Sequence, residues 1–250
     1  MVKLKSPREI ECMRSAGRIV AEALALAQKE AKAGVTTGRL DELVESFIRS
    51  RGGIPVFKGY RGFPKSICAS INEEVVHGIP GKRALREGDI ISIDVGVRYL
   101  NYVADAAVTV GVGTIPPEAE RLMRVTEEAL RLAIAAARPG KKVSDISGVI
   151  QRHAESHGYS VVREYTGHGV GQEMHEDPQV PNFITSQTSK ADEPLRPGMT
   201  LAIEPMVVAG KPKTRVLING WTVVTADGSL AAHYEHTVAV RVGDADILTV

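Results

Sequence analysis

The sequence has 250 residues, the length of one large domain or two small ones. Its 31 Lys and Arg residues balance 30 Asp and Glu residues, which argues against a dedicated nucleic-acid or acidic-membrane binder. Hydrophobic residues make up 43% of the chain and charged residues 24%, as in folded globular proteins.

Cysteine usage and the apolar runs indicate the compartment. Cys12 and Cys68 are too few for a secreted disulfide scaffold. The N-terminus lacks the apolar core of a signal peptide, and no run approaches the ~18 apolar residues of a membrane span. We therefore expect a soluble, cytoplasmic protein.

Two helices are predicted first. Ser6 is placed to cap a helix that has Pro7 in its first turn and Glu9 in the capping-box position, and Gly34 is expected to end it. A second amphipathic helix is expected over residues 40–50. Three β-rich segments follow, at residues 67–71, 90–95 and 106–110.

After Pro116-Pro117 the same order of patterns begins again. Met13-Arg14 recurs as Met123-Arg124, 110 residues later, and Arg86-Glu87-Gly88 resembles Arg196-Pro197-Gly198 at the same offset. This spacing is too long for a solenoid. It predicts an α+β fold in one domain, 1–250, whose halves 1–115 and 116–250 each hold a helix pair and antiparallel strands.

Four acidic residues lie next to apolar β-rich runs. A turn at Tyr99-Leu100 places Asp94 opposite Asp105 on neighbouring strands, where two carboxylates repel unless a cation intervenes. Glu204 stands at an expected strand end before Pro205, and Glu235 begins a second apolar run. The alternative for the aspartates is a solvated turn, which the flanking apolar runs disfavour, whereas each glutamate taken alone is better explained as an acid at a strand edge.

Histidines accompany these acids. His168 lies among three glycines that leave room for a ligand near the backbone, His175 follows seven residues later, and His77 lies in a Gly-Pro turn. Singly, each is explained by a structural hydrogen bond. Together, four acids and an imidazole form an oxygen-rich site suited to one or two ions of Mn, Fe, Co or Zn.

At this point the sequence resembles a known family. The five residues Asp94, Asp105, His168, Glu204 and Glu235, with the motifs around His168, His175 and Glu235, are similar to type I methionine aminopeptidases over nearly the whole chain. The resemblance implies the pita-bread fold of two pseudo-symmetric halves around a central metal site, and removal of the initiator methionine before a small, uncharged second residue.

The resemblance also implies a role for each residue. The five residues would hold two divalent ions, of Co, Mn, Fe or Zn, with Asp105 and Glu235 bridging them and a bridging hydroxide as nucleophile. Glu204 would move a proton to the leaving amine, His175 would stabilise the oxyanion and His77 would contact the scissile amide. The methionine pocket would be formed by Tyr60, Phe63, Cys68, Met174 and Trp221. The alternative for all five is ordinary core packing, which is about as good an explanation for Phe63 and Met174.

One departure from the family pattern and two rival functions stay open. Val103-Ala104 stands where members often carry His-Gly, which puts the metal preference in question. The rivals are an X-Pro aminopeptidase or prolidase relative, for which an additional N-terminal domain is usual, and an inactive pita-bread binding module. The expected partners are nascent N-termini, with transient ribosome contact left open, no nucleic acid, no membrane and a monomeric state.

Overall fold

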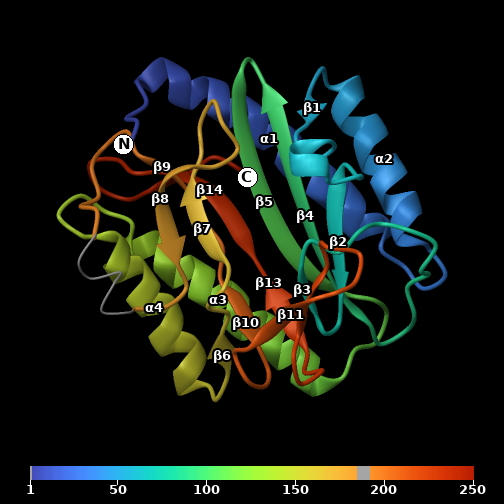
Figure 1. Cartoon of the computed structure of the whole chain (residues 1–250). Coiled ribbons are helices and arrows are strands. Elements are labelled where there is room, and N and C mark those ends of the chain that lie inside the picture. Colours follow the sequence, from blue (N-terminus) through green and yellow to red (C-terminus); the bar gives the residue numbers. More distant parts are fainter. Residues whose placement is uncertain (1, 185–191) are drawn as a thin grey trace.

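The computed structural model describes residues 2–184 and 192–250 (Figure 1). The helices in these ranges are α1 (Pro7–Glu30), α2 (Thr37–Ser50), α3 (Pro117–Ala136), α4 (Val143–Ser156) and the 3-10 turn η1 (Tyr60–Gly62). The strands are β1 (Ile54–Pro55), β2 (Ile67–Ile71), β3 (Glu74–Val76), β4 (Ile90–Tyr99), β5 (Tyr102–Gly111), β6 (Ser160–Val161), β7 (Thr166–Gly169), β8 (Glu176–Pro181), β9 (Thr200–Ile203), β10 (Met206–Val208), β11 (Thr214–Val216), β12 (Val223–Thr225), β13 (Ala231–His233), β14 (Glu235–Ala239) and β15 (Asp246–Ile247).

One large sheet joins the two halves of the chain. Its strands run in the order β1-β4-β5-β14-β9-β7-β8, with β2 also paired to β4 and β15 to β14. The pairing of β5 with β14 connects residues from the first half directly to residues from the second. Two small sheets, β13-β10-β6 and β11-β12-β3, complete the β structure of the described residues.

The helix pairs bury one face of the large sheet. Helices α1 and α2 pack against β2, β4 and β5, whereas α3 packs against β9 and β14 and α4 packs against β6 and β8 (Figure 1). On β4 the buried residues Ile91, Ile93 and Val95 belong to the core under α1 and α2. Because side chains alternate along a strand, the residues between them, including Asp94, point to the opposite face.

The predicted helix start is confirmed, and two predicted helix boundaries are wrong. Ser6 accepts a hydrogen bond from the Glu9 amide, and the Glu9 carboxylate accepts one from the Ser6 amide. Helix α1 ends at Glu30 rather than Gly34, because the chain leaves the helix to pair Gly34 with Leu85. Helix α2 begins at Thr37, three residues earlier than expected, because the side chain of the preceding threonine caps it.

The predicted turn between β4 and β5 is also wrong. The two central turn residues are Leu100 and Asn101, with φ angles of 50° and 66°, as a two-residue hairpin turn of this twist requires. Asp94 therefore pairs with Ala107, and Asp105 pairs with Gly96. The two aspartates still share a face of the sheet, because this register differs from the expected one by two residues.

Each half of the chain contains a helix pair followed by strands, and α2 and α4 both have 14 residues. The division into halves at residue 115 within one domain stays a prediction. Among the residues described, no helix combines the length and apolar character needed to cross a membrane.

Candidate metal centre

All twelve side chains predicted for the site line one pocket of about 180 Å³. Its full lining is Phe57, Tyr60, Arg61, Phe63, Cys68, His77, Asp94, Asp105, His168, Met174, His175, Glu204, Trp221 and Glu235. The sequence reasoning missed Phe57 and Arg61. It therefore identified the location of the pocket but not its complete wall.

The strand register places the acids in two rows on the face of the sheet away from the helices. In one row, Asp94 on β4 and Glu235 on β14 lie on either side of Ala107 on β5. The methyl side chain of Ala107 leaves the space between the two carboxylates open. Asp105 lies two residues from Ala107 on β5, so it occupies the next row on the same face.

His168 and Glu204 enter from the other end of the sheet. His168 on β7 pairs with Ala202 on β9, and Glu204 directly follows β9 where Pro205 ends the strand. The distance from His168 Nε2 is 3.4 Å to Asp105 Oδ2 and 3.8 Å to Glu204 Oε1. The ligand atoms of Asp105, His168 and Glu235 all lie within 4.8 Å of one another.

The tautomer of His168 suits metal binding. Its Nδ1 lies 2.9 Å from the carbonyl oxygen of Gly169, which only accepts hydrogen bonds. The neutral ring therefore carries its hydrogen on Nδ1 and leaves a lone pair on Nε2, the atom that points at the acids. A backbone carbonyl that orients a ligating histidine in this way is common at metal sites.

The electrostatics of the acids show why a cation fits between them. Burial raises the pKa of Asp94 to about 7 and raises the pKa of Glu235 well above its usual value, with the neighbouring carboxylates adding to both effects. Burial also opposes the ionisation of Asp105, but the hydrogen bond and charge of His168 outweigh it and lower the pKa of Asp105. Among the described residues, Asp94 Oδ1 is buried without a hydrogen-bond partner. Carboxylate oxygens and one imidazole are a suitable donor set for a divalent ion, which would satisfy this orphaned oxygen.

Two further histidines of the pocket are neutral near pH 7. Burial, followed by the charge of His168, lowers the pKa of His175 to about 4. Burial, followed by the charge of His233, lowers the pKa of His77 to about 4. The Tyr60 hydroxyl lies 2.8 Å from His175 Nδ1 and the two rings stack, so Tyr60 fixes the orientation of the His175 imidazole.

The rest of the pocket is apolar. Phe63 and Trp221 pack edge to face with ring centroids 5.1 Å apart, and Cys68 and Met174 add two sulfur-bearing side chains to the same wall. Burial raises the pKa of the Cys68 thiol, so this sulfur is uncharged near pH 7. The chain therefore places a small, polarizable cavity beside the acids.

Sequence reasoning gave no role to two residues that support the acids. The Thr237 hydroxyl is 2.8 Å from Asp105 Oδ1 and accepts a hydrogen bond from the Asp105 amide. The second supporting residue is His233, whose Nε2 lies 3.5 Å from Oε2 of Glu204. Thr237 lies on β14 two residues after Glu235 and so shares its face, and this alternation was the available signal for Thr237. His233 ends the preceding strand β13, two residues before Glu235. Val103 and Ala104 are fully buried, and their side chains offer Asp105 no polar support.

Comparison with known families and proteins gives a consistent result. The model of metallopeptidase family M24 matches residues 11–242. Methionine aminopeptidase 1 of Bacillus subtilis is 51% identical over all of this chain and 99% of its own length. Methionine aminopeptidase of Escherichia coli is 44% identical over 99% of this chain and 94% of its own length.

Solved structures agree in fold. The methionine aminopeptidase of Thermotoga maritima superposes with a TM-score of 0.96 at 47% identity, covering 100% of this chain and 99% of its own. The prolidase of Pyrococcus furiosus superposes with a TM-score of 0.79 at 22% identity, covering 99% of this chain and 65% of its own, which is a likeness of fold alone. The pita-bread α+β fold predicted from the sequence is confirmed.

Proposed function

This chain belongs to metallopeptidase family M24, and we propose that it removes the N-terminal methionine from polypeptides whose second residue is small and uncharged. Two findings support the proposal. Relatives named methionine aminopeptidase match the chain from end to end. The main structural support is that five potential metal ligands and a sulfur-containing apolar wall line the same pocket.

A member of this family uses a divalent metal, and we assign its ligands to Asp94, Asp105, His168, Glu204 and Glu235. We propose that these five residues would hold two ions, of Co, Mn, Fe or Zn. When bound, such ions activate water and polarise the carbonyl of the scissile bond.

Glu204 is the proposed proton carrier. It lies at the end of β9, where the strand stops and the carboxylate reaches the pocket. One of its oxygens approaches His168 and the other approaches His233, so the carboxylate is held from two sides. In this position it accepts a proton from the attacking water and passes it to the leaving amine.

His175 is the proposed donor to the oxyanion. Its pKa of about 4 keeps the ring neutral, and we assign the Tyr60 hydroxyl, 2.8 Å from Nδ1, as the donor in their hydrogen bond. The ring hydrogen is then on Nε2, where it donates to the developing negative charge, an effect worth about 3 kcal/mol at comparable sites. His77, also neutral and lining the pocket, is proposed to contact the scissile amide or the following residue.

The apolar wall is proposed to bind the methionine side chain. An unbranched thioether fits a small pocket of aromatic rings and sulfur atoms, because it is flexible and polarizable. The proposed partners are the N-termini of nascent polypeptides, with transient ribosome contact as the open question. We propose that the chain acts as a monomer in the cytoplasm.

Peptide hydrolysis tests the proposal. The metal-depleted chain, reloaded separately with Mn, Fe, Co and Zn, should release methionine from Met-Ala-Ser, and release leucine from Leu-Ala-Ser more than about tenfold more slowly. The variant Glu204→Gln should show a kcat at least about 100-fold lower than that of the parent chain. Glu164→Gln is the matched control, because Glu164 is exposed, and it should retain full activity. Equal release of Met and Leu would contradict the specificity, and metal binding without hydrolysis would favour a binding module.

A further inference from the structure

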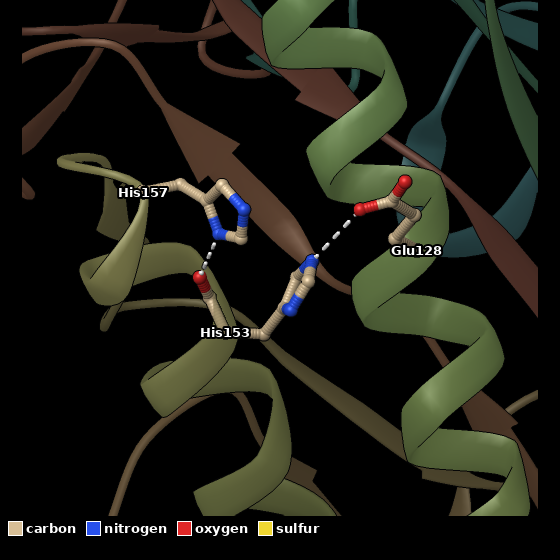
Figure 2. Close-up of side chains that lie close together, drawn as sticks. All are labelled: Glu128, His153 and His157. Carbon is tan, nitrogen blue, oxygen red and sulfur yellow. Dashed lines mark hydrogen bonds and ion pairs between the residues drawn. The ribbon is translucent and has the colours of Figure 1, made fainter.

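A second cluster of potential metal ligands lies on the helices α3 and α4, outside the catalytic pocket. His153 on α4 and His157, the residue that caps its end, are four positions apart and therefore share a face of the helix. Glu128 on α3 faces them across the packed helix pair, and Figure 2 shows the three side chains converging. None of the three lines the catalytic pocket or has a part in the proposed function.

The distances in this cluster match those around a metal ion. One ligand atom from each of the three residues lies within 4.8 Å of the other two. His153 Nε2 and Glu128 Oε2 are 3.3 Å apart, close to the spacing of two ligands on a tetrahedral zinc with bonds of about 2.0–2.1 Å. Apart from this contact with Glu128, the buried His153 Nε2 has no hydrogen-bond partner among the described residues.

The backbone fixes the second imidazole in a ligating tautomer. His157 Nδ1 lies 2.8 Å from the carbonyl oxygen of His153 and must donate to it, which leaves the lone pair on Nε2. In Figure 2 the other ring nitrogen of His157 points to the space beside His153 and Glu128. Arg121 on α3 donates to the His157 carbonyl over 3.0 Å and so holds this end of α4 against α3.

We propose that Glu128, His153 and His157 form a zinc-binding site that joins α3 to α4. Two imidazoles and one carboxylate are ligands that zinc accepts, and two histidines four residues apart on a helix bind it in the same way. The three residues are only partly buried, so water has access to the fourth ligand position. Because the ligands come from two helices, bound zinc links them and stabilises the folded chain.

Zinc stoichiometry tests this site independently of the catalytic centre. The full-length metal-depleted chain should bind one more Zn²⁺ than the variants Glu128→Gln and His157→Gln. These variants should retain their peptidase activity, because neither residue lines the pocket. Glu155→Gln is the matched control, since it removes a carboxylate from the same helix outside the cluster and should keep the additional equivalent.

Two further readouts connect the extra ion to these side chains. Zinc should shift the ring ¹⁵N NMR signals of His153 and His157 in the parent chain, and it should raise the melting temperature more in the parent than in Glu128→Gln. Circular dichroism confirms that each variant is folded. Equal zinc stoichiometry in the parent and both variants, or unchanged signals of the two rings at saturation, would overturn the proposal while leaving the peptidase function untouched.

Discussion

Glu204 Oε2 lies 3.5 Å from His233 Nε2, and the His233 imidazole is 2% exposed. Among the described residues this buried nitrogen has no hydrogen-bond partner, so Glu204 is the polar group it faces. The His233 backbone is itself fixed, since its amide donates to the Thr109 hydroxyl and its carbonyl accepts from it. The imidazole is therefore a rigid support for the proposed proton carrier.

This contact predicts the effect of His233→Gln. Loss of the ring frees the Glu204 carboxylate to turn away from the reacting atoms, and we expect kcat to fall by about 10- to 100-fold. His236→Gln is the matched control, because His236 points to the other face of β14 and contacts Thr249. Steady-state hydrolysis of Met-Ala-Ser measures both variants, and an unchanged kcat in His233→Gln would rule out the supporting role.

Thr237 gives a second prediction. Its hydroxyl holds Asp105, and Thr237→Val removes that bond and leaves the buried Asp105 amide without its acceptor. We expect metal affinity to fall by about 10- to 100-fold, as for other residues that orient a ligand. Thr126→Val removes a buried hydroxyl on α3 from a residue that does not line the pocket, and should leave affinity unchanged. Equal affinities in the two variants would show that Asp105 is positioned without Thr237.

The raised pKa values predict that metal binding strengthens with pH. Without metal, Asp94 has a pKa of about 7 and His168 a pKa of about 9, so at pH 6 both carry a proton that a metal must displace, and at pH 8 only His168 does. We expect Mn²⁺ to bind at least about tenfold more tightly at pH 8 than at pH 6. Calorimetry in buffers of different ionisation enthalpy counts the protons released. Asp94→Asn should bind more weakly at both pH values and release fewer protons, whereas pH-independent binding without proton release would contradict the assignment.

The sequence predicted which residues form the site better than how they reach it. It placed Asp94 and Asp105 on one face of the sheet, although it expected a turn at Tyr99-Leu100. Leu100 has a positive φ that leucine rarely adopts, so the only local signal for the true turn was Asn101, a residue type that tolerates positive φ. The predicted shared face of Asp94 and Asp105 was still correct, because a register shift of two residues leaves each side chain on the same face of the sheet.

The convergence of the two halves could not be derived from local patterns. Glu235 reaches Asp94 only because β14 pairs with β5, between residues more than 100 positions apart. No periodicity within either strand specifies that pairing. The sequence analysis grouped the acids by their chemistry and by the family resemblance and did not predict this pairing, whereas the helix start at Ser6 followed from capping chemistry alone.

The burial of His236 predicts how the fold responds to acid. Burial lowers the pKa of His236 to about 4, against 6.5 for an ordinary histidine, so between these values the unfolded chain binds a proton that the folded chain does not. The stability that follows is complete above pH 6.5 and is lost as the pH falls towards 4, by about 3 kcal/mol for this one group. His236→Gln removes the titrating ring, and we expect it to lose less stability than the parent between pH 7.5 and pH 4.5 in urea unfolding. His77 and His175, which have lowered pKa values too, titrate in both proteins and cancel in the comparison. Equal losses in the two proteins would mean that the folded chain protonates His236 as readily as the unfolded chain does.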